Sequence, residues 1–350
     1  MPTVESSVKL DFSDVLLKPK RSEIASRNDV FLERSFTFKY SKRQWTGIPI
    51  IVANMDTTGT VEMARQLEKH KMITCLHKYH TANEIPKDLN RDFFAITTGI
   101  SNQDIENLNN IVNEVNPHFI CIDVANGYST KFIETVKKIR SLYPHITLMG
   151  GNVVTEEMVL ELVVNGGLDI VKIGIGSGSV CTTRLQTGVG YPQFSAILEC
   201  ANAAHGIDAQ IISDGGIVHV GDFGKAFGAG ADFVMCGSMF AGHDECMKNN
   251  IIITENGKTY CVFYGMSSDK AMKKYSGGVA NYRSAEGKCV KILYKGPVEA
   301  TILNILGGLR STMTYIGALK LKHIPRCAHF IQVNNQVNKV HNGMEIEKNF

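Results

Sequence analysis

Eight short apolar runs lie along this chain of 350 residues, and longer connecting segments separate them. They lie at residues 49–55, 73–78, 93–100, 119–127, 146–153, 169–176, 210–217 and 233–240. Most starts are about 20 to 27 residues apart, and helical periodicity fills the gaps, as in repeated strand–helix units. Near-continuous apolar runs such as residues 50–53 indicate strands covered on both faces. The chain is therefore predicted to be an α/β protein, a (β/α)8 TIM barrel.

Two segments interrupt this repeat. A Gly-rich connection at residues 174–191 follows the sixth run, and a polar segment at about 251–295 follows the eighth. Loops longer than about 15 residues are uncommon inside a compact domain and are usually functional. We therefore expect a long loop after strand six and a mobile flap after strand eight. The prediction is a single barrel domain over residues 1–350, with an N-terminal extension (about 1–48), the flap (about 251–295), a closing helix (297–321) and a C-terminal tail (about 323–350).

The composition excludes several other classes of protein. The formal net charge is only +3, and no clustered basic face suggests nucleic acid as a partner. The charged fraction of 20% excludes a disordered chain. No apolar run reaches the roughly 18 residues of a membrane helix, and the first residues lack the features of a secretion signal, so a cytoplasmic protein without membrane partners is expected. Nine cysteines without a Cys-x-x-Cys pair argue for reduced thiols and against zinc.

Two Gly-rich phrases end the last two runs. Ser-Asp-Gly-Gly occupies residues 213–216, and Cys-Gly-Ser occupies 236–238. Barrels of this kind often bind phosphate after strands seven and eight, where glycine lets backbone N–H groups approach an anion. The alternative interpretation is that these two phrases form tight turns and bind no phosphate. Asp214 repels phosphate but can accept hydrogen bonds from ribose hydroxyls, so a nucleotide is favoured over a bare sugar phosphate.

A third phrase, Gly-Ile-Gly-Ser-Gly-Ser-Val-Cys-Thr-Thr-Arg at residues 174–184, follows the sixth run. Its spacing fits neither a Rossmann turn nor a P-loop. Cys181 stands out because it lies in a polar loop at the catalytic end, where loop amides and Arg184 can favour its thiolate. From spacing alone, a nucleophile and an inert thiol are equally good interpretations.

Several of these phrases together resemble the IMP dehydrogenase and GMP reductase family. The family phrases are Gly-Ser-Val-Cys-Thr-Thr-Arg (178–184) and Ser-Asp-Gly-Gly (213–216), and those resembling its reductase branch are at 264–268, 282–288 and 307–311. The similarity covers nearly the whole chain. The regulatory insertion that most of the dehydrogenases carry after strand two is absent, since only residues 80–92 lie there. The resemblance implies NADPH-dependent reductive deamination of GMP to IMP and ammonia, in purine nucleotide salvage.

The resemblance implies a covalent mechanism. Attack of Cys181 on purine C2 separates the expulsion of ammonia from the delivery of hydride to a thioimidate, which avoids direct displacement of a poor leaving group. Thr183 and Glu286 match the hydroxyl and carboxyl that protonate the departing amine. Without the resemblance, Thr183 is explained as a turn-capping hydroxyl and Glu286 as a solvated charge.

The resemblance also implies binding positions. For GMP these are Ser179, Asp214, Gly215, Gly216, Gly237, Ser238, Gly265, Met266, Ser267, Arg283, Ser284, Ala285 and Gly287. For NADPH they are Ser26, Arg27, Lys78, Asp123, Val124, Ala125, Ile175, Gly176, Met266, Tyr282, Arg283, Ser311, Thr312, Met313 and Thr314. Part of the second set is expected from a neighbouring subunit of a homotetramer. Arg27 and Lys78 suit the cofactor's 2′-phosphate, although solvent exposure also explains a lysine at a strand end.

A potassium site is implied at the carbonyls of Gly176, Gly178 and Cys181 together with Arg184. One departure concerns this loop: Ser177 stands where the family usually has proline, and loss of the fixed φ is expected to loosen it. Three other functions stay open. They are an IMP dehydrogenase that lacks the insertion, a Schiff-base aldolase using Lys172, and a non-catalytic regulator that binds purine nucleotides.

Overall fold

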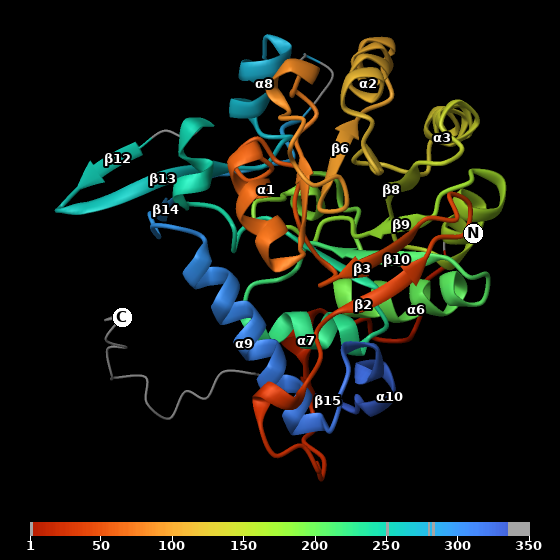
Figure 1. Cartoon of the computed structure of the whole chain (residues 1–350), viewed down its shortest axis with the longest axis vertical. Coiled ribbons are helices and arrows are strands. Elements are labelled where there is room, and N and C mark those ends of the chain that lie inside the picture. Colours follow the sequence, from red (N-terminus) through yellow and green to blue (C-terminus); the bar gives the residue numbers. More distant parts are fainter. Residues whose placement is uncertain (1–2, 250–251, 279–280, 282–283, 335–350) are drawn as a thin grey trace.

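The centre of the computed structural model is a closed barrel of eight parallel strands, hydrogen-bonded in the order β10-β11-β4-β5-β6-β7-β8-β9 (Figure 1). The structure describes residues 3–249, 252–278, 281 and 284–334. The barrel strands are β4 (Ile50–Val52), β5 (Ile73–Leu76), β6 (Phe94–Thr98), β7 (Phe119–Asp123), β8 (Thr147–Val153), β9 (Ile170–Ile173), β10 (Gln210–Asp214) and β11 (Phe233–Cys236). Each lies inside one of the eight predicted runs, so the predicted barrel is confirmed.

All the predicted strands except the one at β8 extend past the carboxyl ends of the observed strands, and β9 and β10 show why. β9 ends at Ile173 and β10 at Asp214, whereas the predicted runs continue for three more residues. The backbone explains the difference, because Gly176 and Gly215 have φ values of +80° and +90°. Extended strands need negative φ, and glycine is the residue that most easily adopts the opposite sign. These residues therefore form loops above the barrel.

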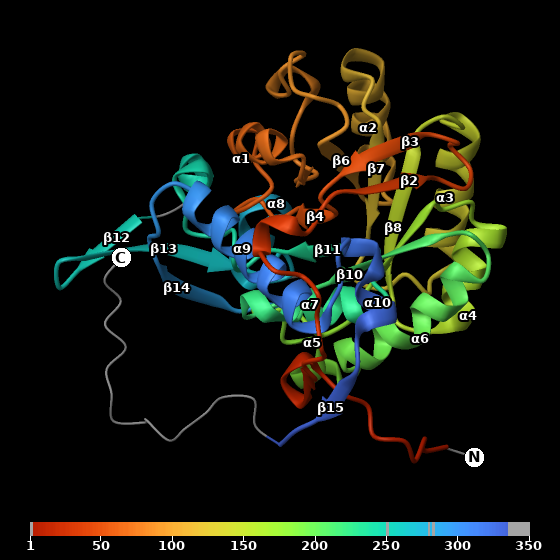
Figure 2. The same ribbon diagram turned by 60° about the horizontal axis from the view of Figure 1, so that its bottom comes forward.

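Helices cover the outside of the barrel (Figures 1 and 2). They are α1 (Val61–Leu67), α2 (Asn102–Val115), α3 (Thr130–Leu142), α4 (Glu156–Leu160), α6 (Gln193–His205), α7 (Val220–Gly228) and α9 (Glu299–Ile316). In α2, for example, Leu108, Ile111 and Val115 are buried at helical spacing, and the Ser101 hydroxyl caps the first turn. Short 3₁₀ turns lie at Phe12–Asp14, Arg27–Asp29, Glu68–His70, Ala82–Glu84, Asp244–Asn249 and Leu321–His323, and a π turn at Glu161–Asn165 continues α4.

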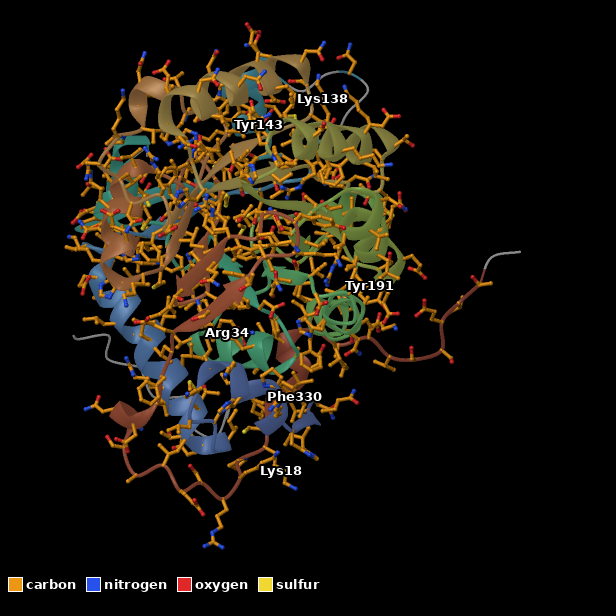
Figure 3. The ribbon with its side chains drawn as sticks, turned by 45° about the vertical axis from the view of Figure 1, so that its right-hand side comes forward. Lys18, Arg34, Lys138, Tyr143, Tyr191 and Phe330 are labelled. Atoms are coloured by element: carbon orange, nitrogen blue, oxygen red, sulfur yellow. The ribbon has the colours of Figure 1, made fainter. Side chains whose placement is uncertain are left out.

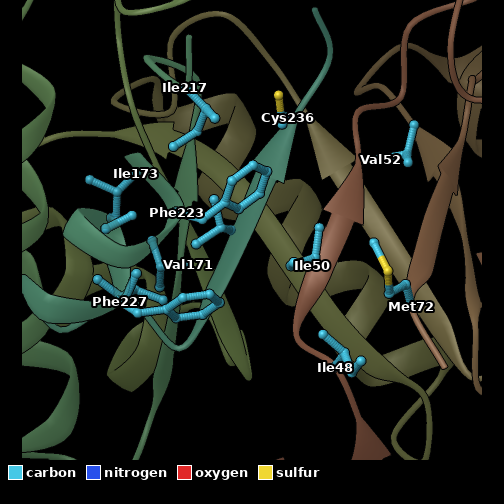
Figure 4. Close-up of a cluster of buried hydrophobic side chains, with 14 of the residues drawn as sticks. Ile48, Ile50, Val52, Met72, Val171, Ile173, Ile217, Phe223, Phe227 and Cys236 are labelled. Atoms are coloured by element: carbon cyan, nitrogen blue, oxygen red, sulfur yellow. The ribbon is translucent and has the colours of Figure 1, made fainter. Parts of the chain in front are cut away.

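The barrel is a packed core rather than a channel. A hairpin of β2 (Arg34–Thr37) and β3 (Gln44–Gly47) closes its amino-terminal end, where the ring of Phe36 lies 4.8 Å from that of Phe233. Between the strands and the outer helices, a second layer includes Phe223 and Phe227 (Figure 4). Because the interior and the amino end are filled, ligands are confined to the carboxyl ends of the strands.

The segment expected as a flap is more regular than a loop. It contains the antiparallel sheet of β12 (Ile252–Glu255), β13 (Lys258–Tyr264) and β14 (Cys289–Leu293), together with helix α8 (Asp269–Ser276). Figure 1 shows this sheet projecting to one side of the barrel. The long connection after β9 likewise contains a short helix, α5 (Thr183–Thr187).

The two ends of the described chain pack together. β1 (Val15–Leu17) pairs antiparallel with β15 (Phe330–Gln332), which follows helix α10 (Ile324–Cys327). The expected tail from residue 323 therefore begins with ordered structure against the N-terminal extension (Figure 2). Among the described helices, none has both the length and the apolar character that crossing a membrane requires.

Candidate active site

A cleft of about 260 Å³ lies at the carboxyl end of the barrel. We call residues 174–191 the cysteine loop and residues 252–295 the flap. The cleft is lined by both segments and by the ends of five barrel strands. Predicted site residues that line it are Asp123, Val124, Ala125, Ile175, Gly176, Gly178, Cys181, Thr183, Asp214, Gly215, Gly265, Met266, Ser267, Glu286 and Gly287.

The three predicted catalytic side chains are in contact. The Cys181 thiol donates to the Thr183 hydroxyl oxygen at 3.2 Å, and that hydroxyl donates to a Glu286 carboxylate oxygen at 2.8 Å. Thr183 is the first residue of helix α5 and follows Cys181 by two residues, while Glu286 comes from the flap. The hydroxyl therefore connects a sulfur nucleophile to a carboxylate, and a proton can pass between them along two hydrogen bonds.

Main-chain contacts hold the flap against the cysteine loop. Cys181 and Gly287 form an antiparallel bridge, and the Thr182 amide donates to the Glu286 carbonyl at 2.8 Å. A side chain at Gly287 would place its Cβ 2.9 Å from the Ser268 amide nitrogen, closer than real Cβ atoms come. Glycine at this position is therefore required for the flap to bring Glu286 to the nucleophile.

A buried ion-pair network forms the floor of the cleft. The Lys172 ammonium lies 2.6 Å from an Asp123 oxygen and 2.9 Å from an Asp214 oxygen, and the Asn152 side-chain amide donates to Asp214 at 2.9 Å. Burial alone lowers the pKa of Lys172, but the two carboxylates outweigh it and raise that pKa well above 10.5. A protonated amine has no lone pair for attack on a carbonyl, so the geometry argues against the Schiff-base aldolase.

Two residues of the cysteine loop differ from expectation. The Arg184 guanidinium pairs with Asp11 at 2.8 Å, so its charge is directed to the N-terminal extension rather than to the thiol. Ser177 lacks the ring of the proline that the family usually has, but its hydroxyl donates a hydrogen bond to the Asp214 carbonyl at 3.1 Å. This hydrogen bond ties the start of the loop to the end of β10 and opposes the expected loosening.

The two loops predicted to bind phosphate are neighbours, because β10 pairs with β11. Gly215 and Gly216 adopt positive φ, and the Ser238 hydroxyl donates to the Ile217 carbonyl at 3.4 Å, which joins the loops. Gly237 is packed closely, since a Cβ there would lie 2.9 Å from the Met55 sulfur. Gly216 faces a separate cavity beside the cysteine loop.

A second cavity of about 210 Å³ adjoins the cleft. Both are lined by Asn54, Asp123, Val124, Ala125 and Met266. Lys78 and helix α8 line the second cavity alone. The Lys78 ammonium lies 3.3 Å from Asp104, so it is an ion-paired cation at the rim rather than a solvated charge only. The predicted cofactor residues at the ends of β5 and β7 thus line one cavity, which adjoins the cleft that holds Cys181.

Some predicted site residues lie elsewhere. Of those that the structure describes, neither cavity is lined by Ser26, Arg27, Ser311, Thr312, Met313, Thr314, Ser179, Gly237, Ser238, Ser284 or Ala285. The turn Arg27–Asp29 packs instead against α9, which carries residues 311–314, and the Arg310 guanidinium donates to the Val30 carbonyl at 3.1 Å. The Arg27–Asp29 turn therefore lies beside residues 311–314 of α9, of which Met313 is fully buried. Tyr282 and Arg283 are outside the described residues.

The predicted cation site consists of main-chain oxygens. The Cys181 amide donates to the Gly178 carbonyl at 3.0 Å, so both residues lie in one tight turn. The paired guanidinium of Arg184 leaves only its main-chain carbonyl as a donor to a cation. Carbonyl oxygens suit hard cations, and within the described residues no three His, Cys, Asp or Glu side chains gather as a metal site. The donor set therefore fits potassium.

Three further residues line the cleft, and the sequence pattern indicates them only in part. Asn54 and Asn152 follow or end strands, so the expectation of ligands at the carboxyl ends of strands includes them. The sequence prediction for Lys172 is a nucleophilic amine only, although a buried lysine in a strand also indicates a carboxylate partner. Asp11 carries no such signal, because its partner Arg184 is 173 residues away.

The comparisons with known proteins agree with this geometry. The family model described as "IMP dehydrogenase / GMP reductase domain" matches residues 9–341. The chain is 56% identical to mouse GMP reductase 1 over 348 residues, which cover 97% of this chain and 99% of the mouse protein. It is 54% identical to human GMP reductase 2 with the same coverage, and 52% identical to the GMP reductase of Caenorhabditis elegans over 99% of this chain and 98% of the worm protein.

Proposed function

The chain belongs to the IMP dehydrogenase and GMP reductase family, and we propose that it is the enzyme that reduces GMP to IMP and ammonia with NADPH. One observation carries the choice of reaction: the Thr183 hydroxyl lies between the Cys181 thiol and the Glu286 carboxylate. That arrangement suits the expulsion of an amine, which needs a nucleophile and a proton donor at the same carbon.

The hydrogen-bond chain supports a defined path for the proton. The thiol proton passes to Thr183, whose own proton passes to Glu286, which leaves a thiolate and a neutral carboxylic acid. The thiolate attacks purine C2, and the proton returns through Thr183 to the 2-amino group. Ammonia then leaves as the C2 carbon becomes a thioimidate on Cys181. Proton transfer of this kind typically contributes about 10²- to 10⁴-fold to the rate.

The rest of the cleft would bind and orient the nucleotide. Backbone amides of the loops at Gly215, Gly216 and Gly237 would suit the 5′-phosphate, because these glycines carry no side chain of their own to keep an anion away. Asp214 accepts from Asn152 and Lys172 and keeps oxygen lone pairs for ribose hydroxyls. Met266 and Ser267 of the flap would contact the base beside Cys181. Ser179, Ser284, Ala285, Gly287 and Arg283 belong to the same proposal.

NADPH would occupy the adjoining cavity and supply a hydride to C2 once ammonia has left. The C2–sulfur bond would then break, which would release IMP and return Cys181 as the thiolate. Its fit is supported by the shared wall at Asp123, Val124 and Ala125, which brings the second cavity next to Cys181. Lys78 at the rim would pair with a phosphate of the cofactor. Ser26, Arg27, Ser311, Thr312 and Thr314 lie outside the cavity, which favours their supply by a neighbouring copy in a homotetramer. Met313 is fully buried in this chain, so its side chain is not part of that surface.

Potassium would bind the carbonyls of the cysteine loop and hold the turn at Gly178. The bound potassium ion, the homotetramer and the cytoplasmic location are parts of this proposal.

The test is an assay of the purified protein with GMP and NADPH, in which we expect NADPH consumption with one IMP and one ammonia per turnover. No reaction with GMP, together with NADH formation from IMP and NAD, would identify a dehydrogenase instead. Tight GMP binding without turnover in either assay would identify a non-catalytic regulator.

A further inference from the structure

The N-terminal extension contacts the cysteine loop from outside the barrel, and we propose that Asp11 and Arg184 form a clamp that positions Cys181. Asp11 is a positioning residue in this proposal, since it acts through Arg184 and not on the substrate. The inference rests on the proposed function for its kinetic consequence, but the position of the thiol can be tested without that reaction.

The clamp is a two-point ion pair. The two terminal nitrogens of Arg184 lie 2.8 and 3.3 Å from the two carboxylate oxygens of Asp11. The second nitrogen also donates to the Tyr191 carbonyl at 2.6 Å. Arg184 follows Cys181 by three residues and Tyr191 ends the loop, so one guanidinium connects the nucleophile's helix, the loop's end and the extension.

The stem of Arg184 also separates the two arms of the loop. A Cβ built on Gly176 would lie 2.6 Å from the Arg184 Cγ, and a Cβ built on Gly190 would lie 2.5 Å from the same atom. Both distances are shorter than real Cβ contacts, so the side chain passes between two positions that only glycine can occupy. The arginine therefore sets the spacing of the arms on either side of Cys181.

Asp11 is itself held firmly. Its carboxylate accepts from the Gln193 amide at 2.6 Å, at the start of α6, and its own amide donates to Asp14 at 2.8 Å. The neighbouring Leu10 exchanges hydrogen bonds with Ser195 of the same helix. Figure 3 labels Tyr191 beside α6, where the extension passes. The clamp thus anchors the loop to a helix of the barrel.

The cysteine loop needs such an anchor. Helix α5 has only five residues, and helices this short are not stable on their own. Without a fixed end, the Cys181 sulfur and the Thr183 hydroxyl would sample positions in which their contact and the approach to C2 are lost. Displacement by about 1 Å can lower a rate by roughly 100-fold.

The test compares Asp11→Asn and Arg184→Lys with Lys9→Ala. Asparagine keeps an acceptor for the Gln193 amide but places an amide against the guanidinium, and lysine keeps the charge but loses the fork. Lys9→Ala is the matched control, because it removes the pair with Glu199 at 2.7 Å and a cation–π contact with the Tyr191 ring at 5.5 Å, and leaves the Asp11–Arg184 pair in place. For each variant, kcat, the KM for GMP, the melting temperature and the rate of Cys181 alkylation by iodoacetamide are measured.

We expect Asp11→Asn and Arg184→Lys each to lower kcat about 10-fold or more, with the KM for GMP changed less than about threefold, and to alter the alkylation rate. The double variant should fall no further than the worse single one, as expected of a coupled pair. A kcat within twofold of the wild type in Asp11→Asn, or an equal loss in Lys9→Ala, would overturn the clamp. If the wild type does not reduce GMP, the proposed function fails, whereas unchanged alkylation in both clamp variants rejects the clamp itself.

Discussion

The cysteine loop and the flap both bring predicted catalytic groups to one cleft, yet they are held in different ways. The cysteine loop is tied by side chains from distant parts of the chain: Asp11 holds Arg184, and the Ser177 hydroxyl reaches the Asp214 carbonyl. The flap meets the loop through main-chain contacts around Gly287. The proposed nucleophile is thus positioned by particular side chains, whereas the position of the proposed proton donor depends on a close approach of two backbones.

A buried carboxylate secures the flap at its other end. Asp56, which follows β4, accepts from the Tyr264 hydroxyl at 2.6 Å, the Tyr275 hydroxyl at 2.7 Å and the Lys274 ammonium at 2.8 Å. Burial and the bond to Asp56 raise the pKa of both tyrosines, so they remain donors throughout the working pH range. The Tyr275 ring stacks on Tyr79 at 3.6 Å. Helix α8 is therefore fixed where it lines the second cavity.

The largest effect should come from the proton donor. Glu286→Gln keeps the shape of the side chain and its bond to Thr183 but cannot take up and return a proton, so we expect kcat to fall about 10²- to 10⁴-fold. GMP binding, measured by calorimetry, should change little because the main-chain contacts of Glu286 remain. A kcat within threefold of the wild type would show that Glu286 is not the donor.

A smaller effect is expected at the flap's anchor. In Asp56→Asn the hydroxyl and ammonium donors lose their charged acceptor, and we expect the KM for NADPH to rise roughly 10-fold, the equivalent of one charge-assisted hydrogen bond. Lys273→Ala is the control, because its pair with Asp269 lies on the exposed face of the same helix. Equal KM values in the two variants would show that Asp56 does not hold the wall of the cofactor cavity.

The smallest effect should lie in the outer flap sheet. Lys291 and Glu255 form a pair at 2.6 Å, but both side chains are 50% exposed. Such pairs contribute about 0.2–1 kcal/mol, so Lys291→Ala should lower the free energy of unfolding by no more than this and leave kcat unchanged. Chemical denaturation and the standard assay measure both quantities. A clear loss of kcat would mean that the outer sheet helps to position Glu286.

The sequence predicted the barrel because parallel strands leave long apolar runs that need no knowledge of their partners. It failed at the strand ends, because every predicted run except the one at β8 continues past the observed strand. At β9 and β10 the runs continue past Ile173 and Asp214 into turns where glycine has positive φ. It also treated the flap as a mobile loop, since glycines and polar residues hid the short strands of its sheet.

The candidate site was also predicted only in part, because local phrases identify some of its residues and contacts between distant residues determine others. Cys181, Thr183 and Glu286 were identified through their phrases, and the structure brings these side chains together. Asp11 was missed because its importance comes from a contact across 173 residues, which local pattern does not encode. Lys172 was identified as a candidate amine, but its charge state depends on two carboxylates, Asp123 at the end of β7 and Asp214 at the end of β10.

The central claim is that Cys181 bonds to the purine during turnover. Mass spectrometry of acid-quenched reactions with GMP and NADPH tests it most directly. We predict a mass increase of one purine nucleotide minus ammonia on the peptide that contains Cys181. Steady NADPH consumption with GMP while that peptide stays unmodified at every quench time would contradict the account.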